Sequence, residues 1–170
     1  MGFSKILSML LTIVMVCMCM PMIAFAADNS CVSFDESSGT LTLSGTVVAS
    51  QVKKYSKDTR VRYVVAEDGT IFPRDCQYLF SNFYAESFIL HGVDTSKVEN
   101  MFCMFRNCEN MIKININNWN TSNVTSVHSM FYNCSSLQVI DLGALDTSKV
   151  TDMSYMFAGC ESLTLWFYQG

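Results

Sequence analysis

A repeat of 26 residues is the feature that most restricts how this chain can fold. Three segments begin with an Asp/Asn-Thr-Ser triplet and end on valine: 94–98, 120–124 and 146–150. A Met-Phe pair and a cysteine follow at the same step, as Met104-Phe105, Met130-Phe131 and Met156-Phe157, then Cys108, Cys134 and Cys160. Copies at constant spacing indicate one structural unit that buries its apolar face by stacking on its neighbours.

Each unit combines two patterns. Val98, Met101, Met104 and Phe105 are spaced i, i+3, i+6 and i+7, which predicts a short helix with the preceding triplet as its N-terminal cap. The runs 111–116 and 137–142 then carry the L-x-x-L-x-L pattern of a leucine-rich-repeat strand. The sequence therefore predicts an α/β leucine-rich-repeat-like solenoid, with a parallel sheet on one side and short helices on the other.

The repeat motif D-T-S-x-V-x-x-M-x-x-M-F-x-x-C resembles that of the BspA-like leucine-rich-repeat surface proteins of bacteria. The same repeat occurs in mycoplasma surface lipoproteins. The resemblance is close from Asp94 to Leu165 and looser upstream. It implies an exported, non-catalytic protein that takes part in adhesion or host interaction.

Residues 1–26 are separate in character from the rest of the chain. Lys5 precedes an apolar run from Ile6 to Met20, and Ala24-Phe25-Ala26 follows. This order is typical of a secretory signal that is cleaved after Ala26, so we expect a secreted or cell-surface protein. The alternative is an uncleaved membrane anchor, because Ile6 to Ala27 contains no charge.

We expect an N-terminal cap over residues 27–70 and a solenoid over 71–170. The cap contains a predicted hairpin at 31–45, a short helix from Val47 to Tyr55 and a strand at 61–65. The solenoid divides into a degenerate unit 71–93, clear units 94–119 and 120–145, and an incomplete unit 146–170.

The last unit departs from its predecessors. By alignment Phe167 replaces the polar Asn115 and Asp141 of the earlier units. Either the chain is a truncated product, or Trp166 and Tyr168 close the core. An exposed final strand would also favour self-association through this C-terminal edge.

Composition excludes two classes of protein. With 50% apolar, 12% aromatic and only 15% charged residues, the chain is not disordered. Its 15 acidic residues outnumber 11 basic ones, for a net charge of −4, which argues against nucleic-acid binding.

The cysteines are predicted to be structural. Cys108, Cys134 and Cys160 occupy one position of successive units and should stack as buried free thiols, about 4.8 Å apart. The sequence has no C-x-x-C pair of the kind that holds a metal. A disulfide between Cys31 and Cys76 stays open at this point.

Catalysis is not expected. Cys103 falls beside His128 of the next unit, but a cysteine nucleophile also needs an orienting group and an oxyanion pocket. His91 is isolated and is expected to lie on the surface. The repeated Asp94, Asn120 and Asp146 are better explained as caps than as calcium ligands. We therefore predict no catalytic residue, no cofactor and no metal.

The outward-facing strand positions are the predicted contact surface, because a curved repeat array presents its sheet as an open face. These positions are Lys113, Asn115, Val139 and Asp141. The predicted function is an interaction or adhesion module whose partner is a protein or a glycan. The alternative is a capping or truncated fragment of a longer repeat protein, with a purely structural role.

Overall fold

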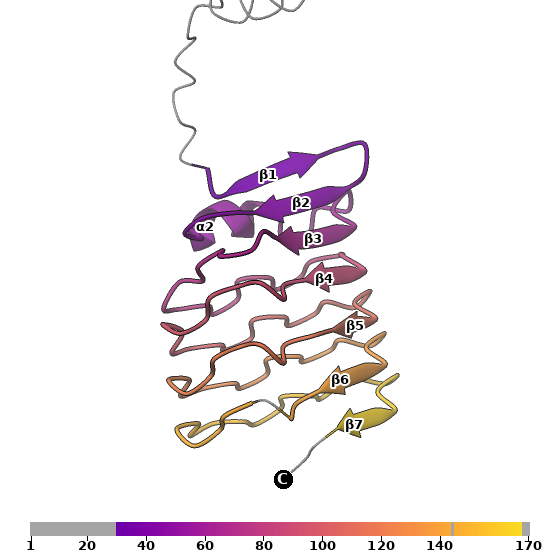
Figure 1. The fold of residues 1–170 in the computed structure, drawn as a ribbon. Coiled ribbons are helices and arrows are strands. Elements are labelled where there is room, and N and C mark those ends of the chain that lie inside the picture. The colour runs from indigo at the N-terminus through magenta and orange to yellow at the C-terminus, as the bar shows by residue number, and fades with distance from the viewer. Residues whose placement is uncertain (1–29, 144, 168–170) are drawn as a thin grey trace, which may run out of the picture.

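The computed structural model describes residues 30–143 and 145–167 (Figure 1). The expected signal segment, 1–26, lies outside them. Within the described residues the chain forms a seven-stranded sheet in which the strands follow one another in chain order. The first pair is antiparallel and every later pair is parallel. One short α-helix and one 3-10 turn accompany this sheet, so the described structure is mostly sheet.

The strands are short and evenly spaced along the sequence: β1 (Val32–Asp35), β2 (Thr40–Leu43), β3 (Tyr63–Ala66), β4 (Ser87–Ile89), β5 (Lys113–Ile114), β6 (Val139–Asp141) and β7 (Leu165–Phe167). The helical elements, α2 (Ala49–Val52) and η1 (Lys53–Tyr55), both lie between β2 and β3. The hairpin and the short helix predicted in the first part of the chain are thus confirmed.

The hairpin β1–β2 follows from its sequence. The alternation in Thr40–Leu43 places Leu41 and Leu43 in the core and the two threonines half-exposed. Gly39 has a φ of +70°, and a Cβ atom there would lie 2.7 Å from the carbonyl oxygen of Arg60. Only glycine fits this turn, because any side chain would meet both the strained φ and the Arg60 backbone.

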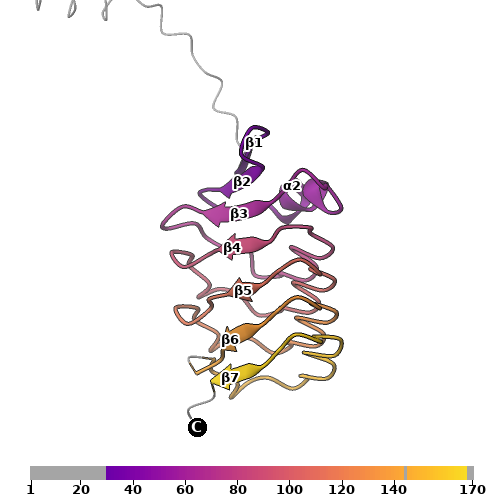
Figure 2. The same cartoon turned by 90° about the vertical axis from the view of Figure 1, so that its right-hand side faces the viewer.

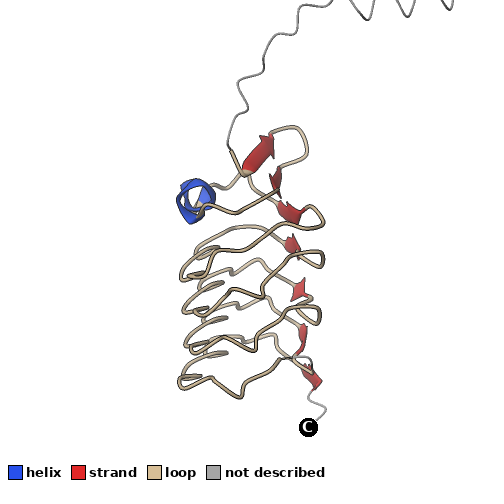
Figure 3. Cartoon of the chain, turned by 60° about the vertical axis from the view of Figure 1, so that its left-hand side comes forward, coloured by secondary structure: helices blue, strands red, loops and turns tan. Residues whose placement is uncertain are grey.

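Residues that are 26 positions apart in the sequence pair with each other on adjacent strands of the sheet. Lys113 pairs with Val139, and Ile114 pairs with Ile140. A second line of bridges runs through Asn100, Ser126 and Asp152 on another side of the chain path. Each repeat therefore lies directly on the previous one, and Figure 3 shows the strands aligned along one side of the resulting stack.

The helix predicted in each repeat is wrong. Residues 102–107 form consecutive turns, and two of them have positive φ: Cys103 at 53° and Asn107 at 60°. The amide of Phe105 donates to the carbonyl of Met130 in the next repeat, at 2.9 Å, where a helix would direct it to residue 101. The spacing i, i+3, i+6, i+7 shows only that one side of the segment is buried. A series of tight turns can produce this pattern as well as a helix can.

The Asp/Asn-Thr-Ser triplets therefore cap turns and not helices. The Asp94 carboxylate accepts a hydrogen bond from the Ser96 amide at 2.9 Å, and Asp146 does the same with Ser148. The buried Thr95 hydroxyl donates to the carbonyl of Asn120 in the next repeat, at 3.2 Å. One triplet thus closes a local turn and also joins two repeats.

Aromatic rings line the centre of the stack. Phe80, Phe105, Phe131 and Phe157 stack in sequence, with centroid distances of 5.3, 5.4 and 5.5 Å. The first three are fully buried, whereas Phe157 is half-buried in the last described turn. Figure 2 shows α2 beside the first strands, at the opposite end from β7.

Candidate functional site

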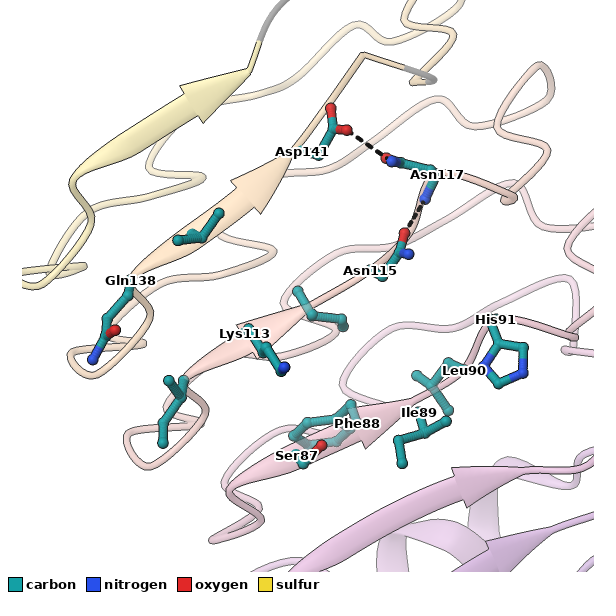
Figure 4. Close-up of a pocket in the computed structure, with 13 residues that line it drawn as sticks. Ser87, Phe88, Ile89, Leu90, His91, Lys113, Asn115, Asn117, Gln138 and Asp141 are labelled. Carbon is teal, nitrogen blue, oxygen red and sulfur yellow. Dashed lines mark hydrogen bonds between the residues drawn. The ribbon is translucent and has the colours of Figure 1, made fainter.

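A shallow groove of about 720 Å³ crosses the outer face of β4, β5 and β6. The four positions predicted as the contact surface all line it: Lys113, Asn115, Val139 and Asp141. Figure 4 shows Lys113, Asn115 and Asp141 on the strands that carry the groove. Ile89 and Ile112 line it as well, from neighbouring turns. The site is thus assembled from three successive repeats, none of which could form it alone.

Strand alternation decides which side chains reach the groove. Ile114 and Ile140 point into the core and are buried, so Lys113, Asn115 and Val139 point outward and are exposed. Asp141 is half-buried. The parallel register then places Lys113 and Val139 side by side on adjacent strands.

The apolar part of the groove consists of exposed aliphatic side chains. Ile89 is 42% exposed, Ile112 44% and Val139 37%. Phe88 also lines the groove but is almost fully buried. Lys113 lies among these residues, and its ammonium group makes no ion pair or hydrogen bond within 30–143 and 145–167.

One end of the groove is a polar cluster. The Asn117 amide nitrogen donates to an Asp141 carboxylate oxygen at 2.7 Å, and the Asn117 backbone amide donates to Asn115 at 3.0 Å. The Gly143 amide donates to the other oxygen of Asp141 at 2.9 Å. These bonds, the Gly143 one first, hold the pKa of Asp141 below its ordinary value, so the carboxylate is ionised at neutral pH.

The groove combines charged, polar and aliphatic side chains. It presents an ammonium group, a carboxylate, amide groups and three aliphatic side chains on a rigid sheet. The exposed His91 lies at its edge. The sequence analysis missed the contributions of Ile89, Ile112 and Asn117, which lie at strand ends or outside the strands.

His128, weighed as a base for Cys103, has other partners. Its Nδ1 lies 2.9 Å from the Ser154 hydroxyl and 3.2 Å from the Asp152 carboxylate, and its ring stacks on Phe102 with centroids 4.9 Å apart. Ser154 also donates to Asp152. In a catalytic triad the acid and the nucleophile bind opposite nitrogens of the imidazole. Here Asp152 and the Ser154 hydroxyl both contact Nδ1 of His128. Cys103 is fully buried.

The pKa of Asp152 is lowered in this cluster. Hydrogen bonds from Ser154 contribute most, and His128 contributes less. The cluster therefore stabilises the ionised carboxylate and links two adjacent repeats. The sequence signal for it was the step of 26 residues from His128 to Ser154.

The repeated acidic positions each bind their own chain. Asp94 and Asp146 accept hydrogen bonds from the serines two residues later, and these bonds lower the pKa of both carboxylates. In the part of the chain that the structure describes, no three histidine, cysteine or acidic side chains are grouped as metal ligands.

The six cysteines of the described residues are free thiols, Cys31 and Cys76 among them. Cys76 donates to the carbonyl of Pro73, and burial raises the pKa of its thiol to about 12. Cys108, Cys134 and Cys160, the cysteine ladder, each donate at 3.1 Å to a carbonyl of the preceding turn. The ladder is buried except at Cys160, which is half-exposed.

Stacked 26-residue turns with a groove across their sheet define a repeat protein. Comparison with known families adds a specific match. The family described as "Mycoplasma protein of unknown function, DUF285" matches residues 74–167, and the chain belongs to this family. No curated protein and no solved structure matches the chain.

Among the described residues, no helix has the length and apolar character to cross a bilayer.

Proposed function

We propose that the chain is an exported, non-catalytic interaction module: a leucine-rich-repeat-like solenoid of the BspA-like type that displays the groove on β4–β6 to a protein or glycan. The observation that carries this proposal is the groove itself. Its outward positions differ from repeat to repeat, as Lys113 and Val139 do, while the inward positions beside them repeat as Ile114 and Ile140.

The composition of the groove supports a binding role. Exposed aliphatic side chains on a sheet held by stacked repeats gain free energy when a partner covers them, at roughly 25 cal/mol per Å². Lys113 on the adjacent strand and the ionised Asp141 on the same strand add opposite charges near Val139. Such charges select a partner by orientation more than they add affinity.

Export is supported by the sequence of residues 1–26, with its positive charge, its apolar run and Ala24-Phe25-Ala26. An interaction module outside the cell would serve in adhesion or host contact, as the resemblance to bacterial surface proteins implies.

The test is a binding screen of the full chain against a glycan array and a panel of extracellular proteins. The groove variant is Lys113→Glu combined with Val139→Asp. The matched control is Lys97→Glu combined with Thr125→Asp, which changes exposed residues away from the groove. We expect binding by the wild type and the control and at least tenfold weaker binding by the groove variant. Equal binding by all three proteins would reject the groove as the contact surface.

A second candidate function is that of a structural starting piece for a longer repeat array. It is favoured by Met153 and Tyr155, which are 53% and 66% exposed in the last described turn, although the equivalent Met101 and Cys103 are buried. Adding one consensus turn, a copy of 119–145, after Gly170 tests it, because the copied Asn120 then follows Asp146 by 26 residues. The structural role predicts a higher melting temperature for the extended chain, whereas an unchanged melting temperature contradicts it.

A further inference from the structure

Cys134 and Cys160 lie in contact at one position of adjacent turns. The Cys160 thiol donates to the carbonyl of Phe131 at 3.1 Å, and that same carbonyl accepts the backbone amide of Cys134 at 3.2 Å. The Cys134 thiol in turn donates to the carbonyl of Phe105, so the two cysteines occupy the same place in adjacent turns. Neighbouring parallel segments run about 4.8 Å apart, within the range of about 4.4–6.8 Å that a disulfide requires between Cα atoms.

Solvent access distinguishes this pair from the rest of the cysteine ladder. Cys108 and Cys134 are fully buried under the next turn, whereas Cys160 is half-exposed in the last described turn. An oxidant in solution can therefore reach Cys160 and, through it, Cys134. It cannot reach the pair Cys108–Cys134 without opening the stack.

The pKa values of the ladder thiols also single out Cys160 as the most reactive cysteine. The contact with Cys134 lowers the pKa of the Cys160 thiol. The pKa of Cys134 is raised, by that same contact first and by burial second. Burial raises the pKa of Cys108 to about 12. The reactive thiolate therefore forms at Cys160, with a second thiol already in contact.

We propose that Cys134 and Cys160 are a redox pair that closes into an intramolecular disulfide when the protein meets a small-molecule disulfide oxidant. The Cys160 thiolate attacks one sulfur of the oxidant, forming a mixed disulfide and releasing a thiolate. The Cys134 sulfur then attacks the Cys160 sulfur and expels the second thiol, which leaves with the Cys134 proton. Two protein thiols are oxidised and one oxidant disulfide is reduced to two thiols.

The disulfide would fasten the least covered turn of the stack to its neighbour. Residues 135–159 form the closed loop, so the bond restricts the unfolded chain and raises the melting temperature. This inference is independent of the groove and of any partner bound there.

The test is peptide mapping of the reduced full chain after treatment with oxidised glutathione. Trypsin places the relevant cysteines on separate peptides, because cleavage follows Lys97, Arg106, Lys113 and Lys149. Cys103, Cys108, Cys134 and Cys160 then fall on 98–106, 107–113, 114–149 and 150–170. We expect the linked pair 114–149 with 150–170 to form about tenfold faster than the linked pair 107–113 with 114–149.

Two variants complete the test. Cys160→Ser should abolish the linked peptide and the rise in melting temperature on oxidation, and Cys108→Ala should keep both. Two results on the wild-type chain would overturn the proposal even if a variant failed to fold. One is a glutathione adduct on Cys160 with Cys134 still free. The other is equal rates of linkage for both cysteine pairs.

Discussion

Apolar side chains lie near both ends of the described stack, but they are buried at one end and partly exposed at the other. At the N-terminal end the hairpin β1–β2 and helix α2 lie over the stack (Figure 2). Leu41, Leu43 and Val52 of these elements are fully buried. In the last described turn Met153 is 53% exposed, although Met101, two repeats earlier, is fully buried. The repeat thus determines where an apolar side chain points, and the neighbouring turn determines whether it is buried.

The largest expected effect comes from placing a charge at equivalent positions. Met101→Asp inserts a carboxylate into the core and should cost at least about 4 kcal/mol, enough to unfold a domain of ordinary stability. Met153→Asp changes an exposed position and should cost less than about 1 kcal/mol. Urea unfolding followed by circular dichroism measures both. Similar losses would show that the last turn is covered in solution.

A second comparison removes a ring from the aromatic stack. Phe131→Ala leaves a cavity between Phe105 and Phe157 and should cost about 3–5 kcal/mol. Phe157 is only half-buried, so Phe157→Ala should cost about half as much. The same unfolding curves give both values, and an equal cost would contradict the difference in coverage.

Glycine substitution sharpens the comparison, because here the C-terminal turn should be the more sensitive end. Gly159 has a φ of +79°, and a Cβ there would lie 3.1 Å from the Cα of Asn133 in the preceding turn. Gly45, between the hairpin and α2, has a φ of +60° and open space around it. We expect Gly159→Ala to cost about 2 kcal/mol and Gly45→Ala about 1 kcal/mol. Thermal unfolding would reveal the reverse order if the last turn were loosely stacked.

The smallest expected effect is on the pH dependence of stability, and it should be the same for Asp94 and Asp146. The pKa values of Asp94 and Asp146 are lowered by the serines two residues later. A lowered folded-state pKa gives stability that is present above the ordinary value of 3.8 and is lost as pH falls through the folded value. Asp94→Asn and Asp146→Asn should therefore weaken the acid-induced loss slightly and equally. Melting temperatures at neutral pH and below pH 3.8 measure it, and an effect at only one position would count against this account.

The sequence predicts the register of the stack and misassigns the turns within it. The step from Lys113 to Val139 is both the sequence period and the strand pairing. The helix prediction failed at Cys103 and Asn107, because apolar spacing carries no information about the sign of φ. Asparagine tolerates positive φ, so Asn82, Asn107 and Asn133 were a signal for turns that the apolar spacing outweighed.

The groove could be predicted in part. Strand alternation identified Lys113 and Val139, because the parity of a strand decides which side chains face outward. Ile112 could not be found in this way, because it lies just before β5 and its exposure depends on the turn. The contacts of His128 with Asp152 and Ser154 also needed the structure, since side-chain direction at a turn does not follow from spacing.

Native-state hydrogen exchange tests the central claim most directly. The claim is that the last described turn of the stack is less covered than the 26-residue turns before it. The amides of Met101 and Val127 donate to carbonyls of the following turn, at 3.0 Å each. We predict that peptides covering 98–108 and 124–134 exchange slowly and that the equivalent 150–160 exchanges much faster. Equal protection of all three segments would contradict the account, because it would mean that the last turn is as well covered as those inside the stack.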